Sequence, residues 1–354
     1  MSKYDLKSMT SPELAKYMES IGEKPFRARQ LYEWIHKKQA DGLEQMTNLP
    51  KALRQKLSEE CILRGAQIIK EQHSRIDGTA KYLLQLQDGE TIESVWMKYK
   101  HGNSVCVSSQ VGCRMGCRFC ASTVGGLIRN LTPAELLDQV YQIQRHTGQR
   151  ISNVIIMGIG EPLDNFENVI RFIRMLSDEN GLNISQRNIT LSTCGLVDRI
   201  YDLIKENLTI TLAISLHAPN DSLRQEMMPV AQRFSIEEIM EACRKYTEHT
   251  KRRITFEYTM VEGVNDEPEH AMQLCHLLRG MDGQGKTSYS NLFHVNLIPL
   301  NAVKGRMGKR SHREKIQNFQ NILEKRHVKV TVRREMGSDI DAACGQLRNK
   351  ASIS

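Results

Sequence analysis

Long apolar runs, internal repeats and low-complexity tracts are all absent from this chain of 354 residues. No apolar stretch approaches the roughly 18 residues that a membrane-spanning helix needs. The opening residues, Met-Ser-Lys-Tyr-Asp, contain no apolar core of a secretion signal. We therefore expect a cytoplasmic protein with no membrane partner.

The length and the charge limit the class of protein further. A chain of 354 residues with 40% hydrophobic residues is long enough for one large domain and a smaller appendage. Lys and Arg number 49 against 41 Asp and Glu, which gives a net charge of +8. This balance suits a polyanion such as nucleic acid, although many soluble proteins are mildly basic. The nine cysteines, an odd number, favour thiols, clusters or catalysis in a reducing compartment.

Three cysteines stand close together in the glycine-flanked stretch 112–126. Cys113, Cys117 and Cys120 form a C-x3-C-x2-C arrangement, which predicts an iron–sulfur cluster. Three thiolates hold three corners of a cubane and leave one iron open to an amino-acid chelate. A structural zinc site is disfavoured because the sequence has no second C-x2-C or H-x3-5-H pair to complete a tetrahedron. A second alternative is that these cysteines only fill a hydrophobic core. It is disfavoured because Arg114 and Arg118 are interleaved with them.

The first part of the chain, residues 1–61, predicts a small helical module. Helix starts are expected at Ser11, Pro25 and Pro50, and no strand pattern is present. Its basic side chains either contact RNA phosphates or form solvated helix faces, and the sequence does not separate these alternatives. The side chains are Arg27, Arg29, Lys37, Lys38, Lys51, Arg54 and Lys56.

Residues 62–100 predict a β-hairpin that connects this module to the rest of the chain. Apolar residues alternate over 82–86, Asp88 and Gly89 form a turn, and a second strand covers 91–99. Glu93 shares a strand face with Val95 and Met97. Desolvation there should raise the pKa of Glu93 and suit it to proton transfer, although a partly solvated strand position is the simpler alternative.

Beyond residue 100, over 101–335, short β-branched runs alternate with helix-length segments. Strands are expected near 105–109, 153–157, 189–192, 209–216, 254–260, 293–298 and 328–332. The capping box Thr132-Pro133-Ala134-Glu135 opens a helix. This alternation predicts a parallel sheet with right-handed crossovers, as an incomplete (β/α)6 barrel of the TIM type. In such barrels the chemistry lies at the carboxyl ends of the strands.

Several of these strands end in short segments that contain polar residues, and these segments are candidates for one binding site. The candidate residues are Gly160 and Glu161 after the second strand, Ser192 after the third, Ser215, Leu216 and His217 after the fourth, and Asn301 after the sixth. A carboxylate there would accept a ligand ammonium group, and hydroxyls or an imidazole would bind a ribose or carboxylate. Each signal alone equally fits a tight turn or a structural hydrogen bond.

Two further cysteines are candidates for catalysis. Cys344 lies in the small-residue loop 341–345, within a C-terminal segment, 336–354, that follows the barrel. Such a loop exposes a thiol, so a thiolate can react. Cys106 lies on the strand just before the cluster motif, from which it would reach the same cavity. An incidental buried cysteine is the alternative for Cys344.

The cysteine spacing is the signature of radical S-adenosylmethionine enzymes, and the chain resembles one branch of them, the RNA adenosine-C2 methyltransferases. The similar segments are Ser108–Cys113, Met157–Leu163, Ser215–Pro219 with Met228-Pro229, and Ile340–Leu347. The resemblance implies a radical S-adenosylmethionine barrel with a [4Fe-4S] cluster on Cys113, Cys117 and Cys120. It also implies that Gly160, Glu161, Ser192, Ser215, Leu216, His217 and Asn301 contact the cofactor, and that residues 1–61 bind RNA.

The resemblance further implies a reaction in which two molecules of S-adenosylmethionine are used per turnover. Cys344 takes a methyl group from the first, and a 5′-deoxyadenosyl radical from the second removes a hydrogen from that methyl. The carbon radical adds to adenine carbon 2, which is electrophilic and mismatched for direct transfer of an electrophilic methyl. Glu93 then accepts the carbon 2 proton, and Cys106 attacks Cys344 to release the RNA and leave a disulfide.

The expected substrates are 23S ribosomal RNA at the peptidyl-transferase centre and transfer RNA next to the anticodon. We expect a monomer that receives electrons from a donor such as flavodoxin or ferredoxin. Two alternatives remain: a 23S adenine-C8 methyltransferase that confers antibiotic resistance, and a non-catalytic, zinc-containing RNA-binding protein. The segment Arg114-Met115-Gly116 looks more like the carbon 2 enzymes.

Overall fold

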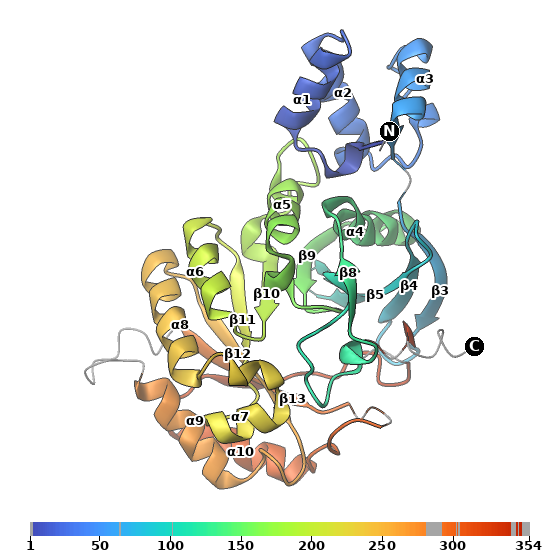
Figure 1. Cartoon of the computed structure of the whole chain (residues 1–354). Coiled ribbons are helices and arrows are strands. Elements are labelled where there is room, and N and C mark those ends of the chain that lie inside the picture. The colour runs from blue at the N-terminus through green and yellow to red at the C-terminus, as the bar shows by residue number, and fades with distance from the viewer. Residues whose placement is uncertain are drawn as a thin grey trace.

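The N-terminal module is a cluster of short helices at one end of the large domain (Figure 1). The computed structural model describes residues 3–63, 65–100, 102–280, 292–301, 303, 305–340, 345, 347 and 348. In the module, α1 (Ser11–Ser20), α2 (Pro25–Tyr32) and α3 (Lys51–Glu60) begin at or next to the predicted starts. Proline within the first two positions and the Thr10–Glu13 capping box explain why α1 begins there. Two short strands, β1 (Tyr4–Asp5) and β2 (Cys61–Ile62), pair in parallel and close the module.

The large domain is built on a parallel sheet, as the sequence predicts. Its strands are β6 (Gly102–Val107), β9 (Ile151–Ile156), β10 (Ile189–Thr193), β11 (Thr211–Ser215), β12 (Ile254–Met260), β13 (Phe293–Pro299) and β14 (Val330–Val332). Each pairs in parallel with the next strand in this order. Strand β12 is buried along its whole length, as expected for the middle of a parallel sheet, whereas β13 alternates between buried and half-buried residues and β14 at the edge is mostly exposed.

Helices cover the outer face of this sheet (Figure 1). They are α4 (Pro133–Thr147), α5 (Phe166–Ser177), α6 (Val197–Lys205), α7 (Asp221–Met227), α8 (Ile236–Thr250), α9 (Pro268–Gly280) and α10 (Arg313–Lys325). The predicted capping box is present: Thr132 Oγ1 accepts the Glu135 N–H, and the Glu135 carboxylate accepts the Thr132 N–H. Alternating strands and helices with an open sheet confirm the incomplete barrel.

Three antiparallel strands extend the same sheet beyond β6. They are β3 (Gln67–His73), β4 (Ala80–Gln85) and β5 (Thr91–Tyr99), and the full order is β14-β13-β12-β11-β10-β9-β6-β5-β4-β3. The sequence predicts β4 and β5 but not β3, because Gln-Ile-Ile-Lys-Glu-Gln-His lacks regular alternation and forms an exposed edge. The predicted connection is therefore part of the barrel wall, with Val95 of β5 directly opposite Cys106 of β6.

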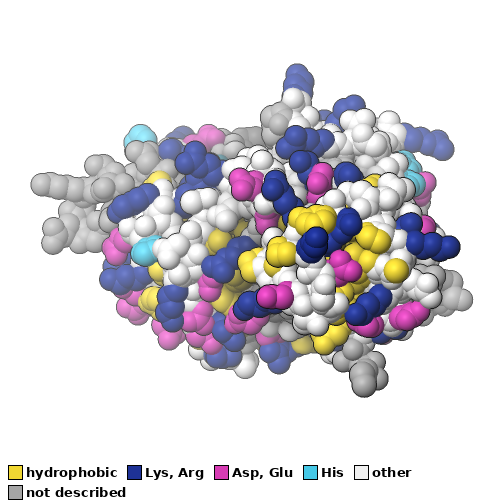
Figure 2. Space-filling model, turned by 90° about the horizontal axis from the view of Figure 1, so that it is seen from above, with side chains coloured by type: hydrophobic (Ala, Val, Ile, Leu, Met, Phe, Trp, Pro, Cys, Tyr) yellow, Lys and Arg dark blue, Asp and Glu magenta, His cyan; other side chains and the backbone are white. Residues whose placement is uncertain are grey.

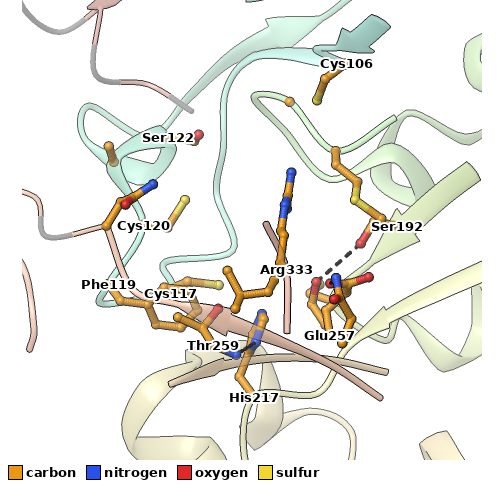
Figure 3. A pocket seen from close by; sticks show the side chains of 18 of the residues that line it. Cys106, Cys117, Phe119, Cys120, Ser122, Ser192, His217, Glu257, Thr259 and Arg333 are labelled. Carbon is orange, nitrogen blue, oxygen red and sulfur yellow. Dashed lines mark hydrogen bonds between the residues drawn. The ribbon is translucent and has the colours of Figure 1, made fainter. Parts of the chain in front are cut away.

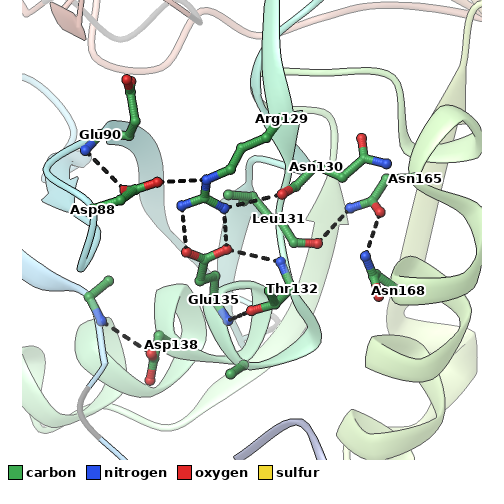
Figure 4. A network of polar contacts seen from close by, with 12 residues as sticks. Asp88, Glu90, Arg129, Asn130, Leu131, Thr132, Glu135, Asp138, Asn165 and Asn168 are labelled. Atoms are coloured by element: carbon green, nitrogen blue, oxygen red, sulfur yellow. Dashed lines mark hydrogen bonds and ion pairs between the residues drawn. The ribbon is translucent and has the colours of Figure 1, made fainter. Parts of the chain in front are cut away.

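A small two-stranded sheet and a polar network brace the region beside the cysteine loop. β7 (Gln110–Gly112) pairs with β8 (Leu127–Asn130), so the cysteine loop connects these two strands. Arg129 of β8 donates to Asp88 in the β4–β5 turn at 2.7 Å and to both oxygens of Glu135 at 2.8 Å (Figure 4). One guanidinium thus ties the hairpin turn, β8 and the first turn of α4 together.

The helical module is attached to α4 and α5 by polar contacts. Lys7 forms a buried ion pair with Asp138 of α4, whose other oxygen accepts the Ala66 N–H at 3.1 Å. Tyr32 Oη donates to Asp178 Oδ2 at 2.9 Å, and His36 Nδ1 lies 2.9 Å from Tyr141 Oη. These contacts hold the module in one orientation on the barrel.

We predict that Asp138→Ala destabilises the protein strongly. The change leaves the Lys7 ammonium, which is 2% exposed, without its carboxylate. Breaking one side of a buried pair typically costs about 3–5 kcal/mol. Urea unfolding followed by circular dichroism measures this loss. Asp202→Ala, which removes an ion pair at the surface with Arg199 and Lys205, should cost less than about 1 kcal/mol. Equal losses in the two variants would contradict the prediction.

Candidate active site

The three motif cysteines lie on one wall of a cavity of about 860 Å³ inside the barrel. The loop that carries them begins after β7, where the Cys113 N–H donates to Gly126 O at 2.9 Å. It then turns back on itself, because Thr123 Oγ1 donates to Cys117 O at 3.2 Å and to Cys120 O at 3.1 Å. Figure 3 shows the Cys117 and Cys120 side chains at this wall. The structure thus brings together the predicted ligand set.

The cavity environment makes these thiols hard to ionise unless a cation is present. Burial raises the pKa of Cys113 to about 12, and a negative charge on Cys120 acts in the same direction. Burial, followed by charges on Cys120 and Cys113, raises the pKa of Cys117 well above its usual value. A bound cluster reverses this effect, since metal coordination deprotonates thiols outright.

Glu161 lines the same cavity as the motif cysteines, and backbone groups hold its carboxylate in place. Its Oε1 accepts the Leu163 N–H at 3.0 Å, and its Oε2 accepts the Cys194 N–H at 2.7 Å. Burial raises the pKa of this carboxyl, while these hydrogen bonds act against the rise. Gly160 precedes it with φ of +108°, and a Cβ there would lie 2.6 Å from Gln110 Cβ. Glycine therefore permits the close approach of the two strand ends.

Most of the predicted strand-end residues meet at this cavity. Ser192, Ser215, His217 and Asn301 line it, as do Gly160 and Glu161. Ser192 Oγ and Ser215 Oγ lie 3.4 Å apart (Figure 3). Leu216 differs, because its side chain is fully buried in the core and does not line the cavity. Its backbone N–H donates to Glu257 O at 3.1 Å.

His217 has an unusual backbone and a fixed tautomer. Its φ is +57°, a left-handed conformation that few side chains adopt. Nδ1 accepts the Thr259 N–H at 3.0 Å, so the neutral ring carries its proton on Nε2. Burial, followed by the charge of Arg224, lowers the pKa of His217 to about 3. The ring packs edge-on against Phe119 of the cysteine loop, with 5.1 Å between centroids, and is a neutral hydrogen-bonding group.

The cavity also contains polar residues that the sequence analysis missed. Glu257 of β12 is buried, and its Oε2 accepts from Asn296 Nδ2 of β13 at 2.7 Å. Burial raises the pKa of Glu257, against the effects of Arg333 and Asn296. Arg333, which follows β14, points into the cavity near Glu257 (Figure 3). The sequence did contain one indication of Glu257, since it is the only acidic residue in the strand Ile-Thr-Phe-Glu-Tyr-Thr-Met.

The three predicted catalytic residues have different positions. Cys106 is buried and lines the cavity beside Val95 and Met97 of β5. Glu93 is also buried but does not line the cavity. It forms an ion pair with Lys81 of β4 at 2.9 Å, a partner that the sequence analysis did not foresee. Cys344 lies outside the described residues.

Comparison with known sequences identifies the family. The family described as the radical SAM superfamily, where SAM stands for S-adenosylmethionine, matches residues 107–275. The family described as the ribosomal RNA large subunit methyltransferase N-terminal domain matches residues 4–63. A protein of Lachnospira eligens named "Probable dual-specificity RNA methyltransferase RlmN" is 57% identical over 98% of this chain and 96% of its own length. The chain belongs to the RlmN family. A protein of the same name from Lachnoclostridium phytofermentans is 55% identical over 98% of this chain and 94% of its own length.

A solved structure supports the RlmN assignment at the level of the whole fold. A radical SAM methyltransferase from Sphaerobacter thermophilus matches with a TM-score of 0.90 and 41% identity, over 97% of this chain and 98% of that one. The family match favours the iron–sulfur interpretation of the cysteines over the zinc alternative. Among the described residues, no helix is both long and apolar enough to cross a membrane.

The cysteine loop of this RlmN family member carries donors that suit an iron–sulfur cluster. In the described part of the chain, no three His, Cys, Asp or Glu side chains are close enough together to share one metal ion. A cubane places its irons at separate corners, so its three thiolates need not converge on one point. The soft thiol donors, the enclosed wall and the adjacent cavity space all suit this group.

We predict that His217 contributes to the pH dependence of stability. Its folded pKa, about 3, lies below its ordinary value of 6.5. The unfolded state therefore binds a proton first as the pH falls, so this contribution is complete above about pH 6.5 and is lost as the pH falls toward 3. His217→Asn, which tolerates the left-handed backbone, should make stability fall less steeply between pH 6.5 and 5. Urea unfolding at several pH values tests this, and equal slopes would refute it.

Proposed function

We propose that this protein methylates carbon 2 of adenosine in 23S ribosomal RNA, at the peptidyl-transferase centre, and in transfer RNA next to the anticodon. It acts in the cytoplasm as a monomer. The observation that carries the proposal is the convergence of Cys113, Cys117 and Cys120 with Cys106 and the polar strand ends on one cavity. The family membership of the whole chain supports the same activity.

The cysteine loop and the strand ends bind different cofactors. Cys113, Cys117 and Cys120 hold three irons of a [4Fe-4S] cluster, and S-adenosylmethionine contacts Gly160, Glu161, Ser192, Ser215, Leu216, His217 and Asn301. A cluster bound there and reduced by a donor such as flavodoxin or ferredoxin would supply the one-electron chemistry that cleaves S-adenosylmethionine and generates the 5′-deoxyadenosyl radical. Leu216 takes part through its backbone, because its side chain is in the core.

The protein's own thiols and carboxylate carry the methyl group and the proton. Cys344 is methylated by one S-adenosylmethionine and loses a hydrogen atom from that methyl after a second molecule is cleaved. The methylene carbon bonds to adenine carbon 2. The adduct at this stage is a radical. Glu93 accepts the proton from carbon 2, the electron pair of that C–H bond stays on the adduct, and the one unpaired electron would return to the oxidised cluster. The Cys106 thiolate then attacks the Cys344 sulfur, so the carbon–sulfur bond breaks with its electron pair on the methylene carbon, which takes up a proton; a disulfide forms and methylated RNA leaves. External reduction restores both thiols.

The RNA must present an unstacked adenine to the cavity. A duplex cannot deliver a base edge to a site inside a barrel, so a loop or single-stranded segment is required. The helical module offers an RNA contact surface. On the face seen in Figure 2, Lys and Arg side chains surround exposed apolar atoms. In the module, Phe26 is 50% exposed with Arg27 packed 4.7 Å from its ring centre, and Lys38 lies 3.9 Å over Trp34. Cation and ring pairs of this kind suit phosphates and bases.

The product is tested by mass spectrometry of nucleosides. RNA incubated anaerobically with reconstituted enzyme, reductant and S-adenosylmethionine should contain 2-methyladenosine. Cys117→Ala should abolish both the product and the iron–sulfur absorbance near about 400 nm, because three thiolates are needed to hold the cluster. Cys243→Ala, which alters a buried cysteine of α8, is the matched control and should retain both.

The alternative products give distinct results in the same assay. Detection of 8-methyladenosine would overturn the carbon 2 assignment and leave the cofactor assignment intact. A colourless protein that binds zinc and forms neither nucleoside would overturn the proposal as a whole.

We predict that Cys106→Ala stops the reaction after the carbon–carbon bond has formed. Without the second thiol, nothing displaces the Cys344 sulfur from the RNA carbon. A covalent protein–RNA species should therefore accumulate and appear as a slower band in a denaturing gel. The species should require both S-adenosylmethionine and reductant, and Cys106→Ala/Cys344→Ala should not form it. A Cys106→Ala enzyme that turns over at the normal rate would remove Cys106 from the mechanism.

A further inference from the structure

Glu93 makes contacts that a free catalytic base would not have. Its Oε2 accepts the Gly345 N–H at 2.6 Å and lies 2.9 Å from Lys81 Nζ. Its Oε1 accepts the Arg348 N–H at 2.6 Å. Both carboxylate oxygens are therefore occupied by donors, two of which are backbone groups of the C-terminal segment.

The strand register explains how these groups meet. Lys81 is directly opposite Val95 and Leu83 directly opposite Glu93, so Lys81 and Glu93 are diagonal neighbours on one face of β4 and β5. Lys81 is fully buried and Glu93 is 3% exposed. In such surroundings a hydrogen bond to a carboxylate is stronger than at the surface, and the Lys81 ammonium 2.9 Å away holds the carboxylate in place.

The C-terminal segment has a second attachment on the same strands. Gly337 N–H donates to Asp77 Oδ2 at 2.9 Å in the β3–β4 turn. Asp339 accepts from Ser74 Oγ at 2.6 Å and from the Arg75 N–H at 2.8 Å. Gly337 and Asp339 are thus fixed at the β3–β4 turn, and Gly345 and Arg348 are fixed at Glu93.

Gly345 also packs against the cysteine loop. Its φ is +79°, and a Cβ there would lie 2.9 Å from Ala121 C and Ser122 N. Only glycine fits this contact without displacing backbone. The residue that Glu93 holds therefore lies directly on the loop that carries Cys117 and Cys120, and in the sequence it immediately follows Cys344.

We propose that Glu93, held by Lys81, is a positioning residue that fixes the C-terminal segment at Gly345 and Arg348 against the cysteine loop. This inference rests on the proposed function, since Cys344 is the group whose position matters. Glu93 acts before RNA arrives, by holding the segment where Cys344 is methylated. This role precedes any acceptance of the carbon 2 proton and is separable from it.

The test compares Glu93→Gln with the wild type before any RNA is added. Glutamine has nearly the same shape, but it is neutral and keeps only one acceptor oxygen, so it cannot accept from both Gly345 and Arg348. Hydrogen exchange of the peptide covering 345–348 should quicken by at least about tenfold, in line with the loss of a charge-assisted hydrogen bond. Alkylation of Cys344 by iodoacetamide should become faster, and its methylation by S-adenosylmethionine slower.

Glu71→Gln is the matched control, because Glu71 is a carboxylate on strand β3 of the same sheet that contacts His146 and His73 and not the C-terminal segment. It should leave the exchange of 345–348 unchanged. Lys81→Gln should change this exchange in the same direction as Glu93→Gln. Should Glu93→Gln fail to fold, Glu93→Asp keeps the charge, shortens the side chain by one methylene and tests the same contacts.

The outcomes separate this proposal from the proposed function. Unchanged exchange and alkylation in a folded Glu93→Gln protein would overturn the positioning role. So would Glu93→Gln that methylates Cys344 normally and accumulates only a protein–RNA adduct, since Glu93 would then act only as a base. A wild-type protein that forms no methylated adenosine would refute the proposed function, while the exchange measurement, which needs no turnover, would still report on the contact itself.

Discussion

The backbone pairing of β6 on both of its edges is the constraint on which the rest of the structure depends. On one edge β6 pairs antiparallel with β5, and on the other it pairs in parallel with β9. This strand therefore joins the antiparallel extension to the barrel in a single sheet. Cys106 lies on it between Val95 and Ile155, so the register on both sides fixes the position of this thiol.

The cavity brings together residues that are far apart in the sequence because parallel strands end at one rim. Glu161, Ser192, Ser215 and Asn301 lie at or after the carboxyl ends of four different strands and line the same space. Buried polar groups at such a rim need partners, and here the partners are mostly backbone N–H groups, as for Glu161 and His217. The side chains are consequently held in place by the protein alone, an arrangement that binds a ligand without much rearrangement.

The sequence was sufficient to predict features that depend on local pattern. The cysteine spacing, the alternation of strands and helices, and the Thr132–Glu135 capping box depend on residues close together in the chain. The Lys81–Glu93 pair was not predictable, since it requires the register of β4 against β5. Strand β3 lacks the alternation that marks a half-buried strand. Leu216 was expected at the cofactor, but a strand-end position does not reveal that its side chain points into the core.

The attachment of the helical module to α4 has a consequence for which RNA molecules qualify as substrates. Asp138 of α4 holds the module through Lys7, and the next residue, Gln139, accepts the Ser108 N–H at 2.7 Å and the Ser94 hydroxyl at 2.9 Å. One turn of helix thus connects the module to strands at the cavity. The distance between the module and the cavity is therefore fixed by the protein and not by the RNA. On the proposed function, an RNA qualifies by its three-dimensional shape, with a reactive adenine at a fixed distance from the part that contacts the module, so two RNAs of unrelated sequence can meet the same requirement.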